Sequence, residues 1–334
     1  MLTRRTLLAF PLLGLAPAAT AAAAGEPVRG MTVSCPTWGW EWGSDAMVEA
    51  IADLHGLGVN WIAIHPYARI AQDGSVQWRD LDPANPPVWL RRPIEACAAR
   101  GMKLLVKPHL AYWGSGFSWR GEIEFAEPTV RRRFFAQYGE WVEQLAKCSA
   151  GAGALSVATE LGGVRDEPAW RGVIARVRDV FDGPLTAAVN WDRYAAVPWW
   201  DAVDAVGVQA YFPLLPSMPA SGVPPDDALV QGWRSIHAEL KAVHESTGKP
   251  VVFTELGYNR SRHAPVKPWD YEQGGDDAEA VQAACLRVAL RELEREPWLA
   301  GAFLWKWFPG PVGRENFLMS TQAMRGVIRG AWGP

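Results

Sequence analysis

Short runs of mostly apolar and β-branched residues alternate along the chain with longer stretches of helical periodicity. Several of the short runs are almost continuously apolar, which is typical of strands buried on both faces of a parallel sheet. The eight predicted strands span residues 31–36, 60–65, 103–109, 154–159, 184–190, 205–210, 250–254 and 301–307.

The segments between these runs carry apolar residues three and four positions apart, the spacing of one helix face. Residues 46–54 follow this spacing, and Gly56 and Gly58 are expected to end that helix. A third helix is predicted to open at Glu127-Pro128, and similar patterns over 229–240 and 281–293 mark the sixth and seventh helices.

Strands that alternate with helices in this way predict an α/β protein, a single closed (β/α)8 TIM barrel. An open, doubly wound sheet is the alternative, but no Gly-x-Gly-x-x-Gly follows the first strand. Irregular inserts rich in Pro, Gly and charge follow the sixth strand (213–227) and the seventh (259–277). Such loops form the mouth of a barrel, where active sites are built. The strand ends are therefore where chemistry is expected.

The first 24 residues are predicted to be a twin-arginine signal peptide. Arg4 and Arg5 precede an apolar run that closes on the small residues 21–24. A chance Arg-Arg pair before an apolar start is the alternative. Pro11 and many alanines make the run too weak for a membrane span, and no other segment reaches the ~18 consecutive apolar residues that a span needs. Residues 25–334 are expected to form the catalytic domain, soluble and periplasmic or secreted, with no membrane partner.

Composition narrows the class of protein. Of the 334 residues, 49% are hydrophobic and 21% are charged, which fits a globular chain. The net charge of −3 disfavours a nucleic-acid partner, because duplex binders carry a basic surplus. Nineteen tryptophans are several times the usual share of about 1%. They fill a large core, or their exposed rings bind the apolar faces of sugars.

The cysteines and histidines do not follow metal-site patterns. The four cysteines are scattered, without the paired short spacings of zinc sites. A disulfide between Cys97 and Cys148 is left open. His65 and His109 have no third ligand placed beside them, so neutral hydrogen-bonding roles are favoured over a metal site. No metal and no other cofactor is expected.

Two matching Thr-Glu-Leu-Gly tetrads end the fourth and seventh predicted strands and place Glu160 and Glu255 there. A carboxylate at the end of a buried strand is costly unless it is hydrogen-bonded or used. Either glutamate alone could be salt-bridged to a neighbour, such as Arg165 or Arg260. A matching pair across a barrel mouth suits glycoside hydrolysis instead. One carboxyl, kept protonated, donates its proton to the leaving oxygen while the other attacks the anomeric carbon.

Other strand ends supply candidate sugar-binding or supporting residues. Tyr211, after the sixth strand, is expected to reach Glu255 and hold it ionised; the alternative is a structural tyrosine bonded to backbone. Trp305 and Trp307 share a face of the eighth strand, so one of them could fill the core instead. The complete set of supporting candidates is Tyr211, His109, Asn190, Trp305, Trp38, Lys107 and Trp191.

In this order the motifs resemble glycoside hydrolase family 113, within the clan of retaining barrels that carry catalytic glutamates on strands four and seven. The resemblance implies an endo-acting β-mannanase with Glu160 as acid/base and Glu255 as nucleophile. Many barrels of the clan have Asn before the acid/base where this chain has Thr159, so contact with the substrate 2-hydroxyl is left to Asn190 or His109. The matching stretches are 101–109, 158–161, 190–192, 209–213, 253–258 and 303–308.

The leading hypothesis is a secreted, monomeric, retaining endo-β-glycanase that acts on β-mannan. A second reading keeps this chemistry but changes the substrate to another polysaccharide or a cell-wall glycan. A third is a catalytically silent barrel that only binds carbohydrate. The presence of both Glu160 and Glu255 argues against silence.

Overall fold

The computed structural model describes residues 26–164, 168–217, 222–271, 274–313 and 315–333. The predicted signal peptide, residues 1–24, lies outside these ranges. Within them, no helix combines the length and the apolar character needed to cross a membrane.

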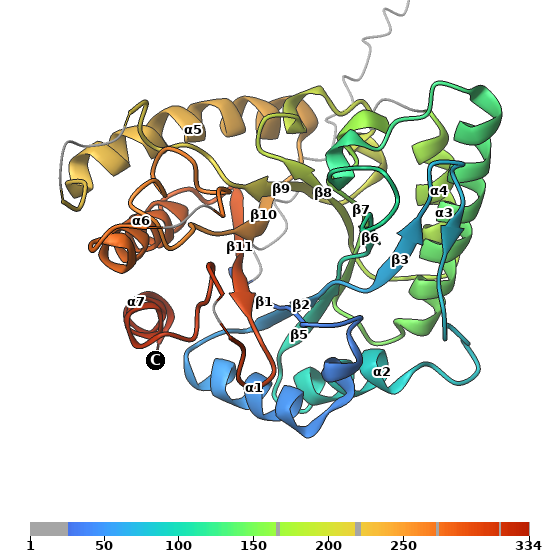
Figure 1. The fold of residues 1–334 in the computed structure, drawn as a ribbon, viewed down its shortest axis with the longest axis horizontal. Helices are drawn as coiled ribbons and strands as arrows, with labels where there is room; N and C mark the ends of the chain where they lie inside the picture. Colours follow the sequence, from blue (N-terminus) through green and yellow to red (C-terminus); the bar gives the residue numbers. More distant parts are fainter. Residues whose placement is uncertain (1–25, 165–167, 218–221, 272–273, 314, 334) are drawn as a thin grey trace, which may run out of the picture.

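Eight parallel strands close into a barrel in the order β1-β11-β10-β9-β8-β7-β5-β2 (Figure 1). Each predicted strand corresponds to one of them, which confirms the closed barrel over the open sheet. Their bounds are β1 Val28–Val33, β2 Trp61–Ile64, β5 Lys103–Val106, β7 Ala154–Thr159, β8 Leu185–Asn190, β9 Val206–Ala210, β10 Val251–Leu256 and β11 Leu299–Trp307.

Helices surround the barrel (Figure 1). As the sequence predicts, α3 begins with Pro128 at its first position. Proline is tolerated there because the N–H of a first residue has no hydrogen-bond acceptor within the helix. Helix α5 ends at Thr247 and is followed by Gly248, whose φ of 67° is left-handed. The helices are α1 Asp45–Gly56, α2 Val88–Ala98, α3 Pro128–Cys148, α4 Ala169–Arg178, α5 Asp226–Thr247, α6 Ala278–Leu293 and α7 Gln322–Trp332.

The connection from β8 to β9 departs from strict alternation. It holds two 3-10 turns, Tyr194–Ala196 and Trp200–Ala202, where the pattern predicts an α-helix. Pro198 lies between them, and a proline interrupts a helix because it has no N–H and disfavours the helical conformation of the residue before it.

A second, three-stranded sheet stands at the mouth and was not predicted. Its strands are β3 Tyr67–Ile70, β4 Val76–Gln77 and β6 His109–Ala111, in the order β4-β3-β6. The predicted strand 103–109 is therefore divided: β5 ends at Val106, and His109 begins β6. Strands β3 and β6 lie on the same side of the barrel as α3 (Figure 1).

Tryptophans serve both purposes that the composition suggested. Trp42, Trp141, Trp170 and Trp233 are fully buried. By contrast Trp40, Trp113, Trp119 and Trp269 are exposed, and all four lie in loops that leave the carboxyl ends of strands. The barrel mouth is therefore where apolar rings face solvent.

The four cysteines are buried and unpaired, so the disulfide between Cys97 and Cys148 is not formed. Burial raises the pKa of the Cys97 thiol to about 12. These cysteines act as small apolar core residues.

Candidate active site

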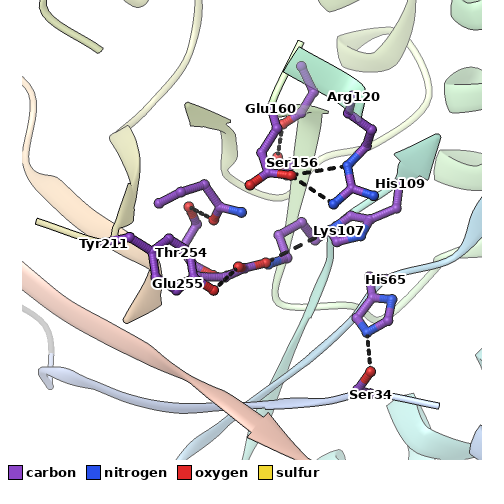
Figure 2. Close-up of polar contacts among 12 residues, drawn as sticks. Ser34, His65, Lys107, His109, Arg120, Ser156, Glu160, Tyr211, Thr254 and Glu255 are labelled. Atoms are coloured by element: carbon purple, nitrogen blue, oxygen red, sulfur yellow. Dashed lines mark hydrogen bonds and ion pairs between the residues drawn. The ribbon is translucent and has the colours of Figure 1, made fainter. Parts of the chain in front are cut away.

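Glu255 lies in β10 and is only 3% exposed (Figure 2). The ammonium group of Lys107 forms an ion pair with its Oε1, and the hydroxyl of Tyr211 donates a hydrogen bond to its Oε2 at 2.6 Å. Lys107 is itself fully buried, and its Nζ also donates to the carbonyl of Thr254 at 3.3 Å. Burial lowers the pKa of Lys107, although the charge of Glu255 opposes this effect. Each oxygen of the carboxylate thus has its own donor.

The contact expected between Tyr211 and Glu255 is present. Burial, together with the charge of Glu255, raises the pKa of Tyr211 well above its ordinary value. The hydroxyl therefore keeps its proton and acts as a donor. Behind this contact the Thr254 hydroxyl donates to Oε1 of Gln209 at 2.9 Å, which links the ends of β10 and β9. The strand ends that carry Glu255 and Tyr211 are fixed to each other.

Glu160 follows the last residue of β7 and has a φ of 57°. Its N–H donates to the carbonyl of Ala188 on β8 at 2.8 Å, which holds this left-handed backbone in place. A non-glycine residue in this region is uncommon, and strained backbone of this kind gathers at functional sites. The local geometry points to a position selected for its side chain.

Arg120 binds the carboxylate of Glu160. Its Nη2 and Nε donate to Oε2 at 2.7 and 3.2 Å. Arg120 opens the 3-10 turn Arg120–Glu122, and this loop packs directly on the loop that follows Glu160. A Cβ atom on Gly163 would collide with the carbonyl oxygen of Ile123. Glycine at that position permits the close approach that brings Arg120 to Glu160.

Both carboxylates face one space at the mouth (Figure 2). In the barrel order β7 and β10 are separated by β8 and β9, so the two glutamates come from opposite parts of the wall. Their charges act on the same neighbours, since both oppose the effect of burial on the pKa of Lys107 and both act on Arg120. Two carboxylates and two cations therefore form one network.

A group of stacked rings borders Glu255. Nε2 of His109 lies 3.9 Å from Oε1 of Glu255, and the ring of His109 stacks on His65 with 4.7 Å between centroids. Trp305 packs against both histidines, and its ring centroid lies 5.2 Å from Nζ of Lys107. Burial lowers the pKa of both histidines well below the ordinary value, so they are neutral at pH 7. In the described ranges, no three His, Cys, Asp or Glu side chains group as metal ligands do.

The remaining sequence-predicted residues lie around this centre. Asn190 ends β8 and lines a small hollow together with Glu160. Trp38 lines a cleft on the side of β1 and β3. Trp191 stacks on Trp269 at 5.4 Å and lines a separate hollow, away from the carboxylates. The structure thus gathers Lys107, His109, Tyr211 and Trp305 at Glu255, and Asn190 at Glu160.

Sequence reasoning missed Arg120 and Gln209. Arg120 belongs to a loop rather than to a strand end, and only the packing of that loop brings it to Glu160. The ion-pair partners suggested from sequence were different ones. Arg165 lies outside the described residues, and the observed partner of Glu255 is Lys107, not Arg260.

A closed barrel with a carboxylate from its fourth strand and another from its seventh, in a mouth bordered by aromatic rings, has the architecture of a glycoside hydrolase. The sequence matches the model of Glycoside Hydrolase Family 113 over residues 32–315, and the chain belongs to this family.

Solved structures share the fold. A GH113 β-mannanase from Alicyclobacillus acidocaldarius, in complex with ManMIm, superposes with a TM-score of 0.76 at 24% identity, covering 92% of this chain and 97% of that one. A GH113 β-1,4-mannanase complex gives a TM-score of 0.78 at 19% identity, covering 92% and 99%. A Faecalibacterium prausnitzii β-glucuronidase gives 0.61 at 14% identity, covering 92% and 48%. A search of curated proteins found no match.

Proposed function

We propose that this glycoside hydrolase is a retaining endo-β-mannanase in which Glu255 is the nucleophile and Glu160 the acid/base. The observation that carries the assignment is the difference between the two carboxylates. The Glu255 side chain is 4% exposed and bound by Lys107 and Tyr211, as suits an anion held for attack. The Glu160 side chain is 16% exposed and faces the mouth, where it can exchange a proton with a leaving group or with water.

In the first half of the reaction Glu255 attacks the anomeric carbon while Glu160 protonates the departing glycosidic oxygen. In the second half Glu160 takes a proton from a water molecule, which displaces Glu255 from the sugar. Negative charge leaves Glu255 as the covalent bond forms and returns as it breaks. Lys107 and Tyr211 stabilise the carboxylate whenever that charge is present.

β-Mannan is the proposed substrate because the GH113 structures with this fold are described as β-mannanases. The exposed rings of Trp40, Trp113 and Trp269 offer flat apolar faces for pyranose units on several sides of the mouth. The cleft on the side of β1 and β3 has room for further sugar units of a chain, which supports endo action. Asn190, beside Glu160, is the proposed contact for the 2-hydroxyl.

The two roles are tested by chemical rescue with azide. Glu255→Ala should lose nearly all turnover, because no covalent intermediate can form. Glu160→Ala should keep the first step for an activated aryl β-mannoside, whose leaving group needs no proton. Azide should then restore its turnover and give the β-mannosyl azide, whereas Glu255→Ala with azide should give the α-azide. Glu245→Ala, at an exposed position on α5, is the control.

An α-azide from the Glu160 variant would reverse the assignment. Absence of rescue in either variant, with both still folded, would contradict the two-carboxylate mechanism. Release of reducing sugar from mannan, glucan, xylan and peptidoglycan tests the substrate. Activity on a polymer other than mannan would favour the second reading, and binding without any hydrolysis would favour the silent barrel.

We also propose that the protein is exported through the twin-arginine signal. The support is the Arg4-Arg5 pair followed by an apolar run and small residues. Replacing both arginines with lysine should leave the precursor in the cytoplasm, as measured by cell fractionation. Unchanged export of this variant would show that the pair is incidental.

A further inference from the structure

A cleft of 490 Å³ opens at the mouth between the loop after β1 and the three-stranded sheet. Its volume lies within the range of ligand sites. Among the residues that the structure describes, its lining holds indole rings, a phenol, an amide and two guanidinium groups but no carboxylate. The residues that matter most are Trp38, Trp40, Trp89, Tyr67, Arg69 and Arg79.

Tyr67 joins this cleft to the catalytic centre. It lines the cleft, and its ring packs edge-on against His65 and His109 with centroids 5.3 and 5.9 Å apart. Nε2 of His109 in turn lies 3.9 Å from Oε1 of Glu255. The rings of Tyr67 and His109 therefore connect the cleft to Glu255.

The register of the small sheet places polar groups on the face that borders the cleft. Tyr67 and Arg69 are two residues apart on β3, so their side chains share a face. Arg69 is paired with Gln77 on β4, which places both side chains on that same face. The guanidinium of Arg69 lies over the ring of Trp38 at 4.5 Å. This stacking orients the plane of the guanidinium and its N–H donors.

The positive charge of the cleft is uncompensated within the described part of the chain. Several surface arginines elsewhere are paired with acids, as in Arg171–Asp201 at 2.9 Å and Arg325–Asp53 at 2.6 Å. Among the residues that the structure describes, neither Arg69 nor Arg79 forms an ion pair. The fork of N–H donors on a guanidinium matches the two oxygens of a carboxylate. In a chain of net charge −3, two guanidinium groups without acidic partners in one cleft favour an anionic ligand.

We propose that this cleft binds a sugar unit that carries a carboxylate, so that the preferred glycan is a β-mannan chain bearing uronate residues. The indoles cover the apolar faces of the pyranose rings, and Arg69 and Arg79 bind the carboxylate. Neutral mannan contacts the same indoles without the two ion pairs. Cleavage of the bound chain rests on the proposed function, but binding does not.

The test is calorimetric binding in a Glu160→Gln background, which blocks turnover of unactivated glycans. The probes are a β-1,4-linked mannuronate hexamer, mannohexaose and a sulfated mannohexaose. The mannuronate hexamer should bind at least ten times more tightly than mannohexaose. Arg69→Gln and Arg79→Gln should each weaken it about tenfold and leave mannohexaose unchanged. Arg329→Gln, at an exposed position on α7, is the matched control and should change neither.

Equal affinity for the charged and neutral hexamers would overturn the proposal, as would an equal loss of both in the arginine variants. Preference for the sulfated chain alone would overturn the carboxylate assignment. The two proposals fail separately. Mannan hydrolysis that needs both glutamates, without any preference for the acidic hexamer, removes only the cleft proposal. Preference for the acidic hexamer in a protein that cleaves no glycan removes only the proposed function.

Discussion

Lys107→Met isolates the electrostatic support of Glu255, because methionine keeps the length of the side chain and removes its charge. The side chains of Lys107 and Glu255 are 0% and 4% exposed, so solvent cannot screen the loss. Breaking a buried ion pair by removing one partner costs about 3–5 kcal/mol. In a domain of this size that corresponds to a fall in Tm of roughly 5–8 °C. Tyr211 remains as a donor but carries no charge.

The loss of the ion pair should also lower kcat, by a factor that reflects the pairing energy. The buried carboxylate of the variant has lost the cation that stabilises its negative charge. If the pairing energy is lost from the reactive form, kcat falls by about 10²–10⁴ at neutral pH.

The alkaline limb of the pH–rate profile should change as well. Burial holds the pKa of Lys107 below its ordinary 10.5, so its charge is present below that lowered pKa and is lost as the pH rises through it. Wild-type activity should therefore decline on the alkaline side earlier than an exposed lysine would allow. Lys107→Met should lack this decline. Initial rates measured across the pH range in both proteins check the expectation.

A double-mutant cycle gives the decisive readout. Glu255→Gln removes the opposite charge, and the double variant buries two neutral groups, so its unfolding free energy should exceed the additive expectation by several kcal/mol. Denaturant unfolding measures all four proteins, and Lys241→Met, from the exposed Lys241–Glu245 pair, should change Tm little. Strictly additive losses would refute the argument that the pair acts as a unit.

Three further outcomes follow from single contacts. Tyr211→Phe should lower kcat roughly 10- to 100-fold with little change in Tm; a large fall in Tm with unchanged activity per folded molecule would make Tyr211 structural. Arg120→Gln should reduce kcat/KM more for unactivated glycans than for activated aryl glycosides, because Arg120 orients the Glu160 carboxyl; equal losses would contradict that role. Hydrogen bonds from Arg325 lower the pKa of Asp53, so this pair stabilises the fold above the ordinary aspartate pKa and is lost as the pH falls through the lowered one. The Tm difference between wild type and Asp53→Asn should therefore shrink on acidification, and a constant difference from pH 6 to pH 3 would contradict it.

The barrel could be predicted from sequence because its strands are buried on both faces and read as apolar runs. Glu160 and Glu255 could be predicted because a carboxylate stands out at the end of such a run. The family resemblance then implied a role for each. What local pattern cannot supply is the conformation of the loops. Arg120 reaches Glu160 only because the loop that carries it packs on Gly163, some forty residues further along the chain.

The small sheet illustrates the same limit. Strand β4 has two residues and β3 has four, too short for an alternating pattern to distinguish them from loop. Their pairing nevertheless determines which side chains share the cleft, since Arg69 and Gln77 come together only across that ladder. The helix wrongly expected between β8 and β9 has a different cause. There the regular alternation of strands and helices was assumed to continue through a segment that Pro198 interrupts.

The two ion pairs of the mouth differ in a way that matches the two tasks of a retaining glycosidase. A nucleophile must keep one protonation state and one orientation, and the pair of Lys107 with Glu255 is closed to solvent and braced by Tyr211. An acid/base must lose and regain a proton in every cycle, which requires contact with the leaving group and with water. The pair of Arg120 with Glu160 is correspondingly more open, with side chains 14% and 16% exposed, and its cation comes from a loop rather than from the barrel wall. If these surroundings were exchanged, water could protonate the nucleophile and no substrate could reach the acid. The burial of each cation is therefore as much a part of the proposed mechanism as the identity of each carboxylate.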